Sequence, residues 1–307
     1  MDSLRSMKYL VRAIELGSLS AVAREQGTTQ PTVSKMLDAL ERSLGVRLLE
    51  RSTSGLAPTD QGMRFYERAK IVLEEFDNAV ADARGLTEKP AGLLRINAPV
   101  AFGQFRLNAM VQQFLTLHPD IDIELILNDR FVDLVEEGVD IALRLGDFLP
   151  PNVVARRIAT SERLLVAAPD YLKRRGNLRQ PDDFDRHDYI RFAWAPAGDT
   201  IQLHGPGGMV EVKTRGRYRV NNAIAIRESL AMGAGIGLCP AWLVHDLLQS
   251  RQLVRVLPDW SAAPQELFML IPSRRYFPLR GKLFMEFIES QLGQLPGFRT
   301  ADKRTLP

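Results

Sequence analysis

The stretch of sequence that decides the fold is GSLSAVAREQGTTQPTVSKMLDALERSLGVRLLERSTSGLAPTDQG, residues 17–62. Glycines at positions 17, 27 and 45 bound two segments whose apolar residues recur at helical spacing. Ser18 can cap the first segment, because its hydroxyl can accept a hydrogen bond from a free amide of the first turn. The stretch therefore predicts two short helices joined by a turn at Gly27.

The second of these helices is expected to have one buried face. Thr28 or Thr29 can cap it, and Pro31 lies in its first turn, where the missing N–H does no harm. Gly45 ends it. Its apolar stripe, which we expect to be buried, consists of Val33, Leu37, Leu40 and Leu44. An amphipathic helix is also expected before Gly17, with its apolar residues at Leu4, Met7, Leu10, Val11 and Ile14.

The opposite face of the second helix carries hydrogen-bonding side chains near its N-terminus. They are Gln30, Thr32, Ser34, Lys35 and Asp38. Such side chains suit a recognition helix, since they can reach base edges in a major groove while the first amides face phosphate. Periodicity alone equally allows an ordinary solvated face on a three-helix unit.

The residues after this helix favour the first interpretation. Residues 46–59 combine the apolar residues Val46, Leu48 and Leu49 with a turn rich in Ser, Thr and Gly. They also contain Arg47 and Arg51. This composition predicts a two-stranded wing that meets the phosphate backbone beside the helix.

Residues 17–62 resemble the winged helix-turn-helix signature of LysR-type transcriptional regulators. The positions that match are Gly17-Ser18, Ala21, Ala23, Gln30-Pro31, Val33-Ser34, Leu40-Glu41, Leu44-Gly45, Leu48, Arg51, Thr59 and Gly62. Three positions depart from the family pattern: Gln26 replaces a usual Leu, Leu49 a usual Phe, and Pro58 an apolar wing residue. The resemblance implies that DNA is contacted by Thr29, Gln30, Pro31, Thr32, Ser34 and Lys35, and by the wing residues Arg51, Ser52 and Thr53.

A long helix is expected from Asp60, because no proline follows before Pro90. Its apolar residues alternate steps of three and four, which is typical of a heptad seam. They are Tyr66, Ala69, Leu73, Phe76, Val80 and Ala83. Such a seam favours pairing with another helix, although packing against its own domain is the alternative. The family resemblance implies a dimer contact here, with residues 1–59 as the DNA-binding domain and 60–89 as the linker helix.

The pattern changes after Lys89-Pro90-Ala91-Gly92 to short apolar strands that alternate with helices, which predicts α/β units. A helix is expected at 130–137, a strand spanning 210–220, and a closing helix at 279–292. Residues 90–292 resemble the two-lobed, periplasmic-binding-protein-like effector domain of the LysR family, and within it the CrgA-like subgroup. Lobe I is expected at about 90–161 and 267–292, lobe II at about 162–266. The tail, 293–307, is expected to be poorly ordered.

The resemblance implies that a small-molecule effector binds between the two lobes. Ligands of open α/β folds bind beyond the carboxyl ends of strands. In lobe I this rule selects Pro99, Val100, Ala101 and Phe102, residues 128–131 including Asn128, and residues 144–146 including Arg144. In lobe II it selects Phe192, Trp194, Asn222 and Gly237. For each position an ordinary loop or core role is equally open.

The effector's chemistry is left open by the residues after the first strand. Many family members place Ser or Thr there to bind a carboxylate, whereas this sequence has Pro99-Val100-Ala101-Phe102. A hydrophobic, aromatic or uncharged effector fits this change. Binding of an anion by backbone amides and Arg144 fits it as well.

Composition narrows the function classes. The net charge of +3 is too small for a protein that binds DNA by bulk charge, and the linker, residues 60–89, carries seven acidic and five basic side chains. We find no Walker loop, nucleophile elbow or zinc-spaced ligand set, so an enzyme is not favoured. The glycine run 233–237 precedes a strand and is expected to be a turn. A lone cysteine, Cys239, is expected to be a buried neutral thiol.

The sequence is therefore interpreted as a transcriptional regulator with no cofactor or metal. A solute-binding protein is the other class that the C-terminal part fits, but the winged helix and the lack of an apolar secretion signal disfavour it. The expected partners are a double-stranded DNA operator, a small-molecule effector and further copies of the chain in a homodimer or homotetramer. The family also allows RNA polymerase as a partner. A cytoplasmic location, with no membrane contact, is expected.

Overall fold

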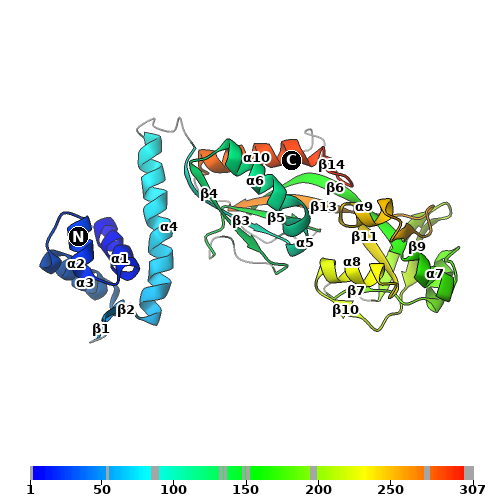
Figure 1. Ribbon diagram of the computed structural model, residues 1–307, viewed down its shortest axis with the longest axis horizontal. Coiled ribbons are helices and arrows are strands. Elements are labelled where there is room, and N and C mark those ends of the chain that lie inside the picture. Colours follow the sequence, from blue (N-terminus) through cyan, green and yellow to red (C-terminus); the bar gives the residue numbers. More distant parts are fainter. Residues whose placement is uncertain are drawn as a thin grey trace. The chain divides into compact units, whose positions relative to one another are not determined.

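The computed structural model describes residues 3–52, 55–83, 90–130, 134, 137–146, 149, 153–193, 199–272 and 277–300. The chain divides into two compact units, Met1–Lys89 and Pro90–Pro307 (Figure 1). The first consists of helices and a small two-stranded sheet, and the second combines helices with a large mixed sheet. Each unit has its own hydrophobic core.

The N-terminal unit contains the predicted helices and wing. Its elements are α1 (Ser3–Leu16), α2 (Leu19–Glu25), α3 (Gln30–Leu44), β1 (Leu49–Ser52), β2 (Gly55–Pro58) and α4 (Asp60–Ala83). Ser18 and Thr29 cap α2 and α3 through their side chains, as the sequence predicts. Gly45 ends α3 in the left-handed conformation, with φ of 70°.

One apolar position of the α3 stripe was predicted wrongly. Val33, Leu37 and Leu40 are buried, but Leu44 is 41% exposed and Val46 is 42% exposed. The stripe of α3 continues past the end of the three-helix core, so its last turn has nothing in the unit to pack against. Leu48 is the buried residue of the following segment, at 1% exposure.

The C-terminal unit is organised around one sheet with strand order β11-β6-β13-β5-β3-β4. In lobe I, β3 pairs in parallel with β4 and β5, and α6 and α10 lie side by side over this region (Figure 1). The lobe I elements are β3 (Gly92–Ala98), α5 (Val100–Phe102), the π-helical segment η1 (Gly103–Leu107), α6 (Asn108–Leu117), β4 (Ile121–Leu127), β5 (Ile141–Leu145) and α10 (Leu279–Leu292).

Two long antiparallel strands, β6 (Val153–Ala167) and β13 (Ala262–Pro272), continue from lobe I into lobe II. Near its C-terminal end β6 pairs with β11. These strands are the two crossovers that the family resemblance implies. The lobe II elements are α7 (Pro169–Arg175), the 3-10 segment η2 (Pro181–Arg186), β7 (Arg191–Phe192), β8 (Thr200–Gly205), β9 (Gly208–Lys213), β10 (Arg219–Val220), α8 (Ala223–Ala231), β11 (Ile236–Pro240), α9 (Ala241–Gln249) and β12 (Val254–Arg255).

One predicted strand of lobe II is wrong. Residues 210–220 form the end of β9 and the separate strand β10, which pair with different partners. Between β9 and β10, Thr214 and Gly216 pack inward, so the chain leaves the β8–β9 hairpin after Lys213. The glycine run 233–237 does lead from α8 into β11, as predicted. The helix expected at 130–137 falls mostly outside the described residues.

The tail was also predicted wrongly for residues 293–300. Arg299 and Thr300 form β14, which pairs with Thr160 and Ala159 of β6. Phe298 is only 8% exposed, and its ring stacks on Trp242 with centroids 5.8 Å apart. This short segment therefore folds onto β6 through the β14 pairing and onto α9 through Phe298, whose buried partner Trp242 belongs to α9.

Candidate functional site

The N-terminal end of α3 presents the face that the sequence predicts. Gln30, Pro31, Thr32 and Lys35 are exposed, and Ser34 is half-buried. The cap residue Thr29 accepts a hydrogen bond from the Thr32 amide at 3.4 Å, and its hydroxyl also lies 2.9 Å from that of Thr32. The buried Val33, at 0% exposure, anchors this first turn in the core and leaves the polar residues on the surface.

The wing follows α3 as a short antiparallel pair in which Arg51 is opposite Leu56. Thr53 lies outside the described residues, and for Arg51 and Ser52 the structure describes only the backbone. The wing is fastened to α3 by Glu41, whose Oε1 accepts hydrogen bonds from the amides of Leu48 at 2.6 Å and Leu49 at 3.0 Å. Glu41 thus fixes where the wing begins relative to the recognition helix.

The return from the wing into α4 is equally constrained. The Thr59 hydroxyl donates to the Arg47 carbonyl at 2.8 Å and accepts from the Gly62 amide at 2.8 Å. A Cβ atom on Gly62 would lie 1.9 Å from the Leu48 carbonyl oxygen, so only glycine fits there without a backbone shift. Glu41, Leu48, Thr59 and Gly62 therefore account for much of the family signature, and their role is to hold the wing in place.

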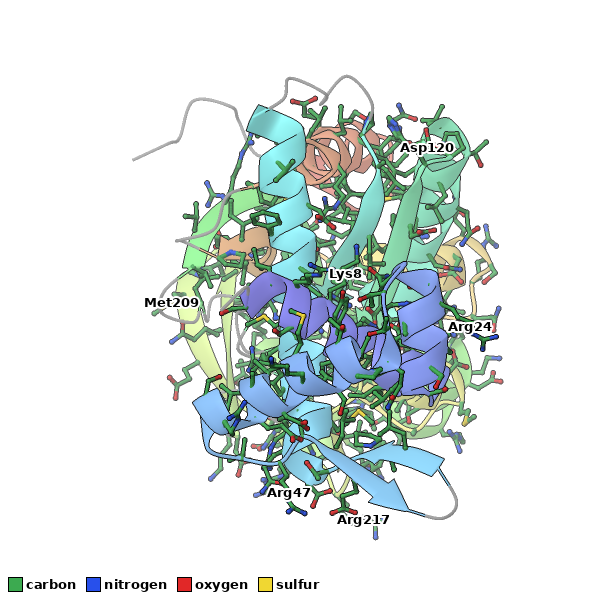
Figure 2. All side chains as sticks on the ribbon, turned by 90° about the vertical axis from the view of Figure 1, so that its left-hand side faces the viewer. Lys8, Arg24, Arg47, Asp120, Met209 and Arg217 are labelled. Atoms are coloured by element: carbon green, nitrogen blue, oxygen red, sulfur yellow. The ribbon has the colours of Figure 1, made fainter. Side chains whose placement is uncertain are left out.

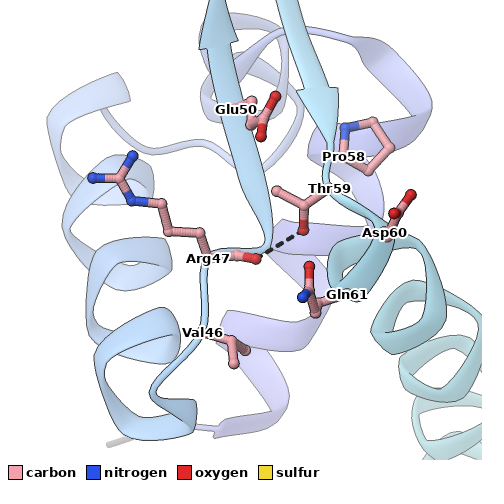
Figure 3. A pocket seen from close by; sticks show the side chains of 7 residues that line it. All are labelled: Val46, Arg47, Glu50, Pro58, Thr59, Asp60 and Gln61. Atoms are coloured by element: carbon pink, nitrogen blue, oxygen red, sulfur yellow. Dashed lines mark hydrogen bonds between the residues drawn. The ribbon is translucent and has the colours of Figure 1, made fainter.

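A pocket of about 510 Å³ lies where the wing meets α4 (Figure 3). Its lining is Val46, Arg47, Glu50, Pro58, Thr59, Asp60 and Gln61. Figure 3 shows the Arg47 side chain on one side of the pocket and Asp60 on the opposite side. One cation among two carboxylates does not favour phosphate binding. Reasoning from the sequence did not find this pocket, since its lining comes from three elements.

The apolar seam of α4 is divided between two roles. Its N-terminal half packs on its own unit, where Ala69 is buried and the Tyr66 hydroxyl donates to Glu15 of α1 at 3.2 Å. Further along, Leu73 and Val80 are half-buried and Phe76 is 47% exposed. Packing within its own unit thus applies to the N-terminal half of the helix, and pairing with another helix stays a prediction for the C-terminal half.

Residues from both lobes of the C-terminal unit meet beyond the carboxyl ends of β3 and β4. Asp129, directly after β4, accepts a hydrogen bond from the Val100 amide at 3.0 Å. From lobe II, the Asn222 Nδ2 atom lies 3.5 Å from the other oxygen of Asp129 and donates to it. Asn222 also caps α8, because its Oδ1 accepts from the Ala225 amide at 2.9 Å. The first strand end, the second strand end and the α8 cap therefore meet at one carboxylate.

Charge and burial make this region of the cleft chemically distinctive. Burial raises the pKa of Asp129 above its ordinary value, although hydrogen bonds from Val100 and Asn222 oppose the change. Arg144, on β5, is 6% exposed, and burial lowers its pKa to about 10. Its Nη1 donates to the Leu143 carbonyl at 2.8 Å.

Asn97 belongs to the same face of lobe I and was missed by reasoning from the sequence. It is fully buried on β3, opposite Ala142 of β5. Among the described residues neither of its side-chain polar atoms has a hydrogen-bond partner, nor does the Oδ1 of Asn128. An amide side chain inside the strand-like run LRINA was the available signal. These amides are acceptors and donors that a small polar molecule can use.

Other predicted cleft residues serve packing. Phe102 is fully buried against Trp242, with ring centroids 5.8 Å apart. Ala101 is buried, and a Cβ atom on Gly237 would lie 2.7 Å from the Leu230 side chain. Pro99 precedes α5 without a side-chain cap bond, and Phe192 is half-buried on β7. Trp194 lies outside the described residues.

A second set of contacts joins the lobes, and no local pattern in the sequence indicates it. Arg106 of lobe I donates to the Trp242 carbonyl at 2.7 Å. The Arg227 guanidinium lies 4.9 Å from the Phe105 ring centroid and forms a bidentate ion pair with Asp246, at 2.6 and 2.7 Å. These contacts fix the lobes on the α8–α9 side of the cleft.

Metal, thiol and membrane features add little to the site. Burial raises the pKa of Cys239 to about 12, which fits the buried neutral thiol that the sequence predicts. No group of three or more His, Cys, Asp or Glu residues able to hold a metal occurs in the described part of the chain. None of the described helices is long and apolar enough to cross a bilayer.

Comparison with known proteins matches both units to one family. Residues 4–63 match "Bacterial regulatory helix-turn-helix protein, lysR family", and residues 87–293 match "LysR substrate binding domain". The chain is 32% identical over 299 residues to the HTH-type transcriptional regulator PtxR of Pseudomonas aeruginosa, covering 97% of this chain and 96% of that protein. It is 28% identical over 294 residues to the HTH-type transcriptional activator TtdR of Escherichia coli, covering 95% and 94%.

Solved structures give the same result. Full-length AphB, a virulence activator of Vibrio cholerae and a member of the LTTR protein family, matches with a TM-score of 0.58 and 27% identity, covering 94% of this chain and 98% of that chain. CrgA of Neisseria meningitidis, a LysR-type transcriptional regulator, matches with a TM-score of 0.62 and 25% identity, covering 94% and 98%. These relatives are transcriptional regulators and not enzymes.

Proposed function

Because the chain belongs to the LysR family of DNA-binding, effector-controlled transcriptional regulators, we propose that Gln30, Ser34 and Lys35 read the bases of its operator. The observation that carries the proposal is the exposed polar face at the start of α3, held by the Thr29 cap and the buried Val33. Hydrogen-bonding side chains at a helix N-terminus can reach base edges in the major groove. Pro31, Thr32 and the wing residues Arg51, Ser52 and Thr53 then contact the backbone.

Replacement of Gln30, Ser34 and Lys35 by Ala tests this proposal. Loss of base contacts worth about 1 kcal/mol or more each should weaken operator binding by at least about 100-fold. Arg42→Ala with Ser43→Ala is the matched control, because both residues are exposed at the far end of the same helix. If the triple variant protects the operator at the same concentration as wild type in a footprinting assay, the assignment is refuted.

The second element of the proposal is a homodimer, or a tetramer of two dimers, joined through the C-terminal half of α4. Val72 is 45% exposed and Phe76 is 47% exposed, while the N-terminal half of the seam is occupied within its own unit. Leu73→Asp with Phe76→Asp should dissociate the dimer and weaken operator binding together, since two linked modules gain effective concentration. Sedimentation at matched protein concentration measures the first effect, and an unchanged association state would refute this contact.

The third element is an effector site around Asp129. This region combines a buried cation at Arg144, the buried amide of Asn97, the buried Oδ1 atom of the half-buried Asn128, and the Asp129 link to Asn222 of lobe II. We propose a small polar effector that contacts Arg144 and these amides and changes the link between the lobes. It acts only if its affinity differs between the two states of the lobes. Contact with RNA polymerase and a cytoplasmic location complete the proposal.

A further inference from the structure

Lobe II carries a strongly basic extended segment, residues 213–219, with the sequence KTRGRYR. Its four cations are Lys213, Arg215, Arg217 and Arg219, and it contains no acidic residue. The whole chain has a net charge of only +3, so this is a local concentration of charge. The segment connects β9 to β10, and β10 pairs through Val220 with Phe192 of β7.

The backbone of this segment is held rigidly. The Tyr189 amide donates to the Arg215 carbonyl at 2.6 Å, and Arg191 donates to the Thr214 carbonyl at 3.1 Å. Thr214 is 3% exposed, and a Cβ atom on Gly216 would lie 1.9 Å from the Tyr189 carbonyl oxygen. Thr214 and Gly216 therefore face inward.

The cations on either side of these two residues consequently face outward in a row. Lys213, Arg215 and Arg217 are exposed, and the Arg217 side chain stands at the surface in Figure 2. Lys213 ends β9 and Arg215 forms a β-bridge with Asp188, so these two residues are about 6.6 Å apart as in an extended chain, and the chain bends at Arg217. This separation is close to twice the rise of about 3.4 Å per nucleotide along one strand of duplex DNA.

Few acidic groups oppose the row. Arg219 pairs with Asp199 at 3.1 Å, whereas no ion pair of Lys213, Arg215 or Arg217 is found among the described residues. Glu211, exposed two residues earlier on β9, limits the row at one end. Three like charges on a rigid backbone repel one another, and a polyanion with regularly spaced charges relieves that repulsion.

We propose that Lys213, Arg215 and Arg217 form a second, sequence-independent contact with the DNA backbone. DNA is favoured over an acidic protein partner because the winged helix already holds duplex DNA, which raises the effective concentration of phosphate around the rest of the chain. Arginine also matches phosphate with paired hydrogen bonds. The inference rests on operator binding by the winged helix and adds a contact from the effector domain.

The test compares two variants of the full-length protein that lose the same charge. One carries Lys213→Ala, Arg215→Ala and Arg217→Ala; the control carries Arg179→Ala, Arg186→Ala and Lys282→Ala, which are exposed and scattered. Affinity for a duplex that holds the operator with long flanks is measured against salt concentration. The row variant should lower the slope of log affinity against log salt by about 2 to 3 per engaged protomer, with about tenfold weaker binding or more at low salt. The control variant should change the salt slope and the low-salt affinity by only a small fraction of these amounts.

Two further arms keep the result interpretable. On a duplex trimmed to the operator core, the row variant should bind as tightly as wild type, because the flanking phosphates are absent; failure of the wild type to bind this core would instead refute the proposed operator function. A charge-preserving variant, with Lys213→Arg, Arg215→Lys and Arg217→Lys, should retain most of the wild-type slope. Equal slopes for the row variant, the control and wild type on the long duplex would overturn the inference, and would leave an acidic protein as the partner to test.

Discussion

The proposed DNA-reading face and the proposed effector site differ in how far apart along the chain their interacting residues lie. On α3 and the wing, Thr29 bonds three residues away to Thr32, and Glu41 bonds seven and eight residues away to Leu48 and Leu49. In the C-terminal unit, Asn222 reaches Asp129 across 93 residues, and Arg106 reaches Trp242 across 136. A local constellation leaves a readable spacing in the sequence, whereas a distant one leaves single residues without a pattern.

The difference also concerns what a family signature records. Of the signature residues, Gly62 lies against the Leu48 carbonyl, and Thr59 bonds the Arg47 carbonyl and the Gly62 amide. These contacts are made within the protein and hold the wing in place. A sequence match can thus identify the winged fold while leaving the operator sequence open.

The largest expected effect tests the local constellation through Gly62→Ala. The added Cβ would meet the Leu48 carbonyl oxygen at 1.9 Å, so α4 and the wing must separate, at a cost of about 3 kcal/mol in unfolding free energy. All three tryptophans belong to the C-terminal unit. In thermal unfolding of Gly62→Ala, far-UV circular dichroism should therefore show part of the helical signal lost at a lower temperature than in wild type. The midpoint followed by tryptophan fluorescence should be unchanged.

Gln61→Ala, at the neighbouring exposed position, is the control for Gly62→Ala and should leave both transitions unchanged. Operator binding should fall with stability in the glycine variant, because the wing loses its position beside α3. If Gly62→Ala unfolds like wild type, the close approach of α4 to the wing is not a constraint, and the local half of the comparison fails.

The next effect tests a distant contact through Phe298→Ala. Phe298 stacks on Trp242 and meets Phe102 edge-on, with centroids 5.9 Å apart, so its removal leaves a cavity between the lobes. We expect the unfolding free energy of the C-terminal unit to fall by about 3 kcal/mol, which lowers the midpoint of the tryptophan fluorescence transition. The unfolding of the N-terminal helices should not change. Gln294→Ala, exposed in the same segment, is the control. An unchanged fluorescence transition would mean that the tail does not bind the crossover strands.

The outcome of the sequence predictions follows the same division. The caps at Ser18 and Thr29 and the end of α3 at Gly45 were predicted because each depends on a residue and its near neighbours. Helix α10 has the predicted bounds, 279–292, because Pro278 and Gly293 flank its apolar run. The LysR family is confirmed, whereas the narrower CrgA-like subgroup stays a prediction.

The predictions that failed depended on what lies opposite a residue in space. Leu44 continues the helical period of α3 but lies past the end of the core. Residues 210–220 were predicted as one strand, but Thr214 and Gly216 face inward toward residues distant in the sequence, and the strand is interrupted there. The tail was judged by its position at the terminus beyond the family resemblance, while Phe298 finds its partner at Trp242. In the cleft, the strand-end rule selected the region of Asp129 and Asn222 but could not show that the two meet.

The smallest expected effect concerns that meeting, through Asp129→Asn and its pH dependence. Because burial raises the pKa of Asp129 in the folded protein, the folded state binds more protons than the unfolded state between the ordinary pKa of 3.8 and the raised value. The stability that Asp129 contributes is therefore present at low pH and is lost as pH rises through this window. Lowered pKa values at Asp183 and Asp246 give the opposite trend, so the variant must be compared with wild type at each pH.

Relative to wild type, the unfolding free energy of Asp129→Asn, followed by tryptophan fluorescence, should increase slightly as pH rises through the window, and that of the exposed control Asp120→Asn should not. A difference that decreases with pH would show that the hydrogen bonds from Val100 and Asn222 outweigh the effect of burial on the Asp129 carboxylate.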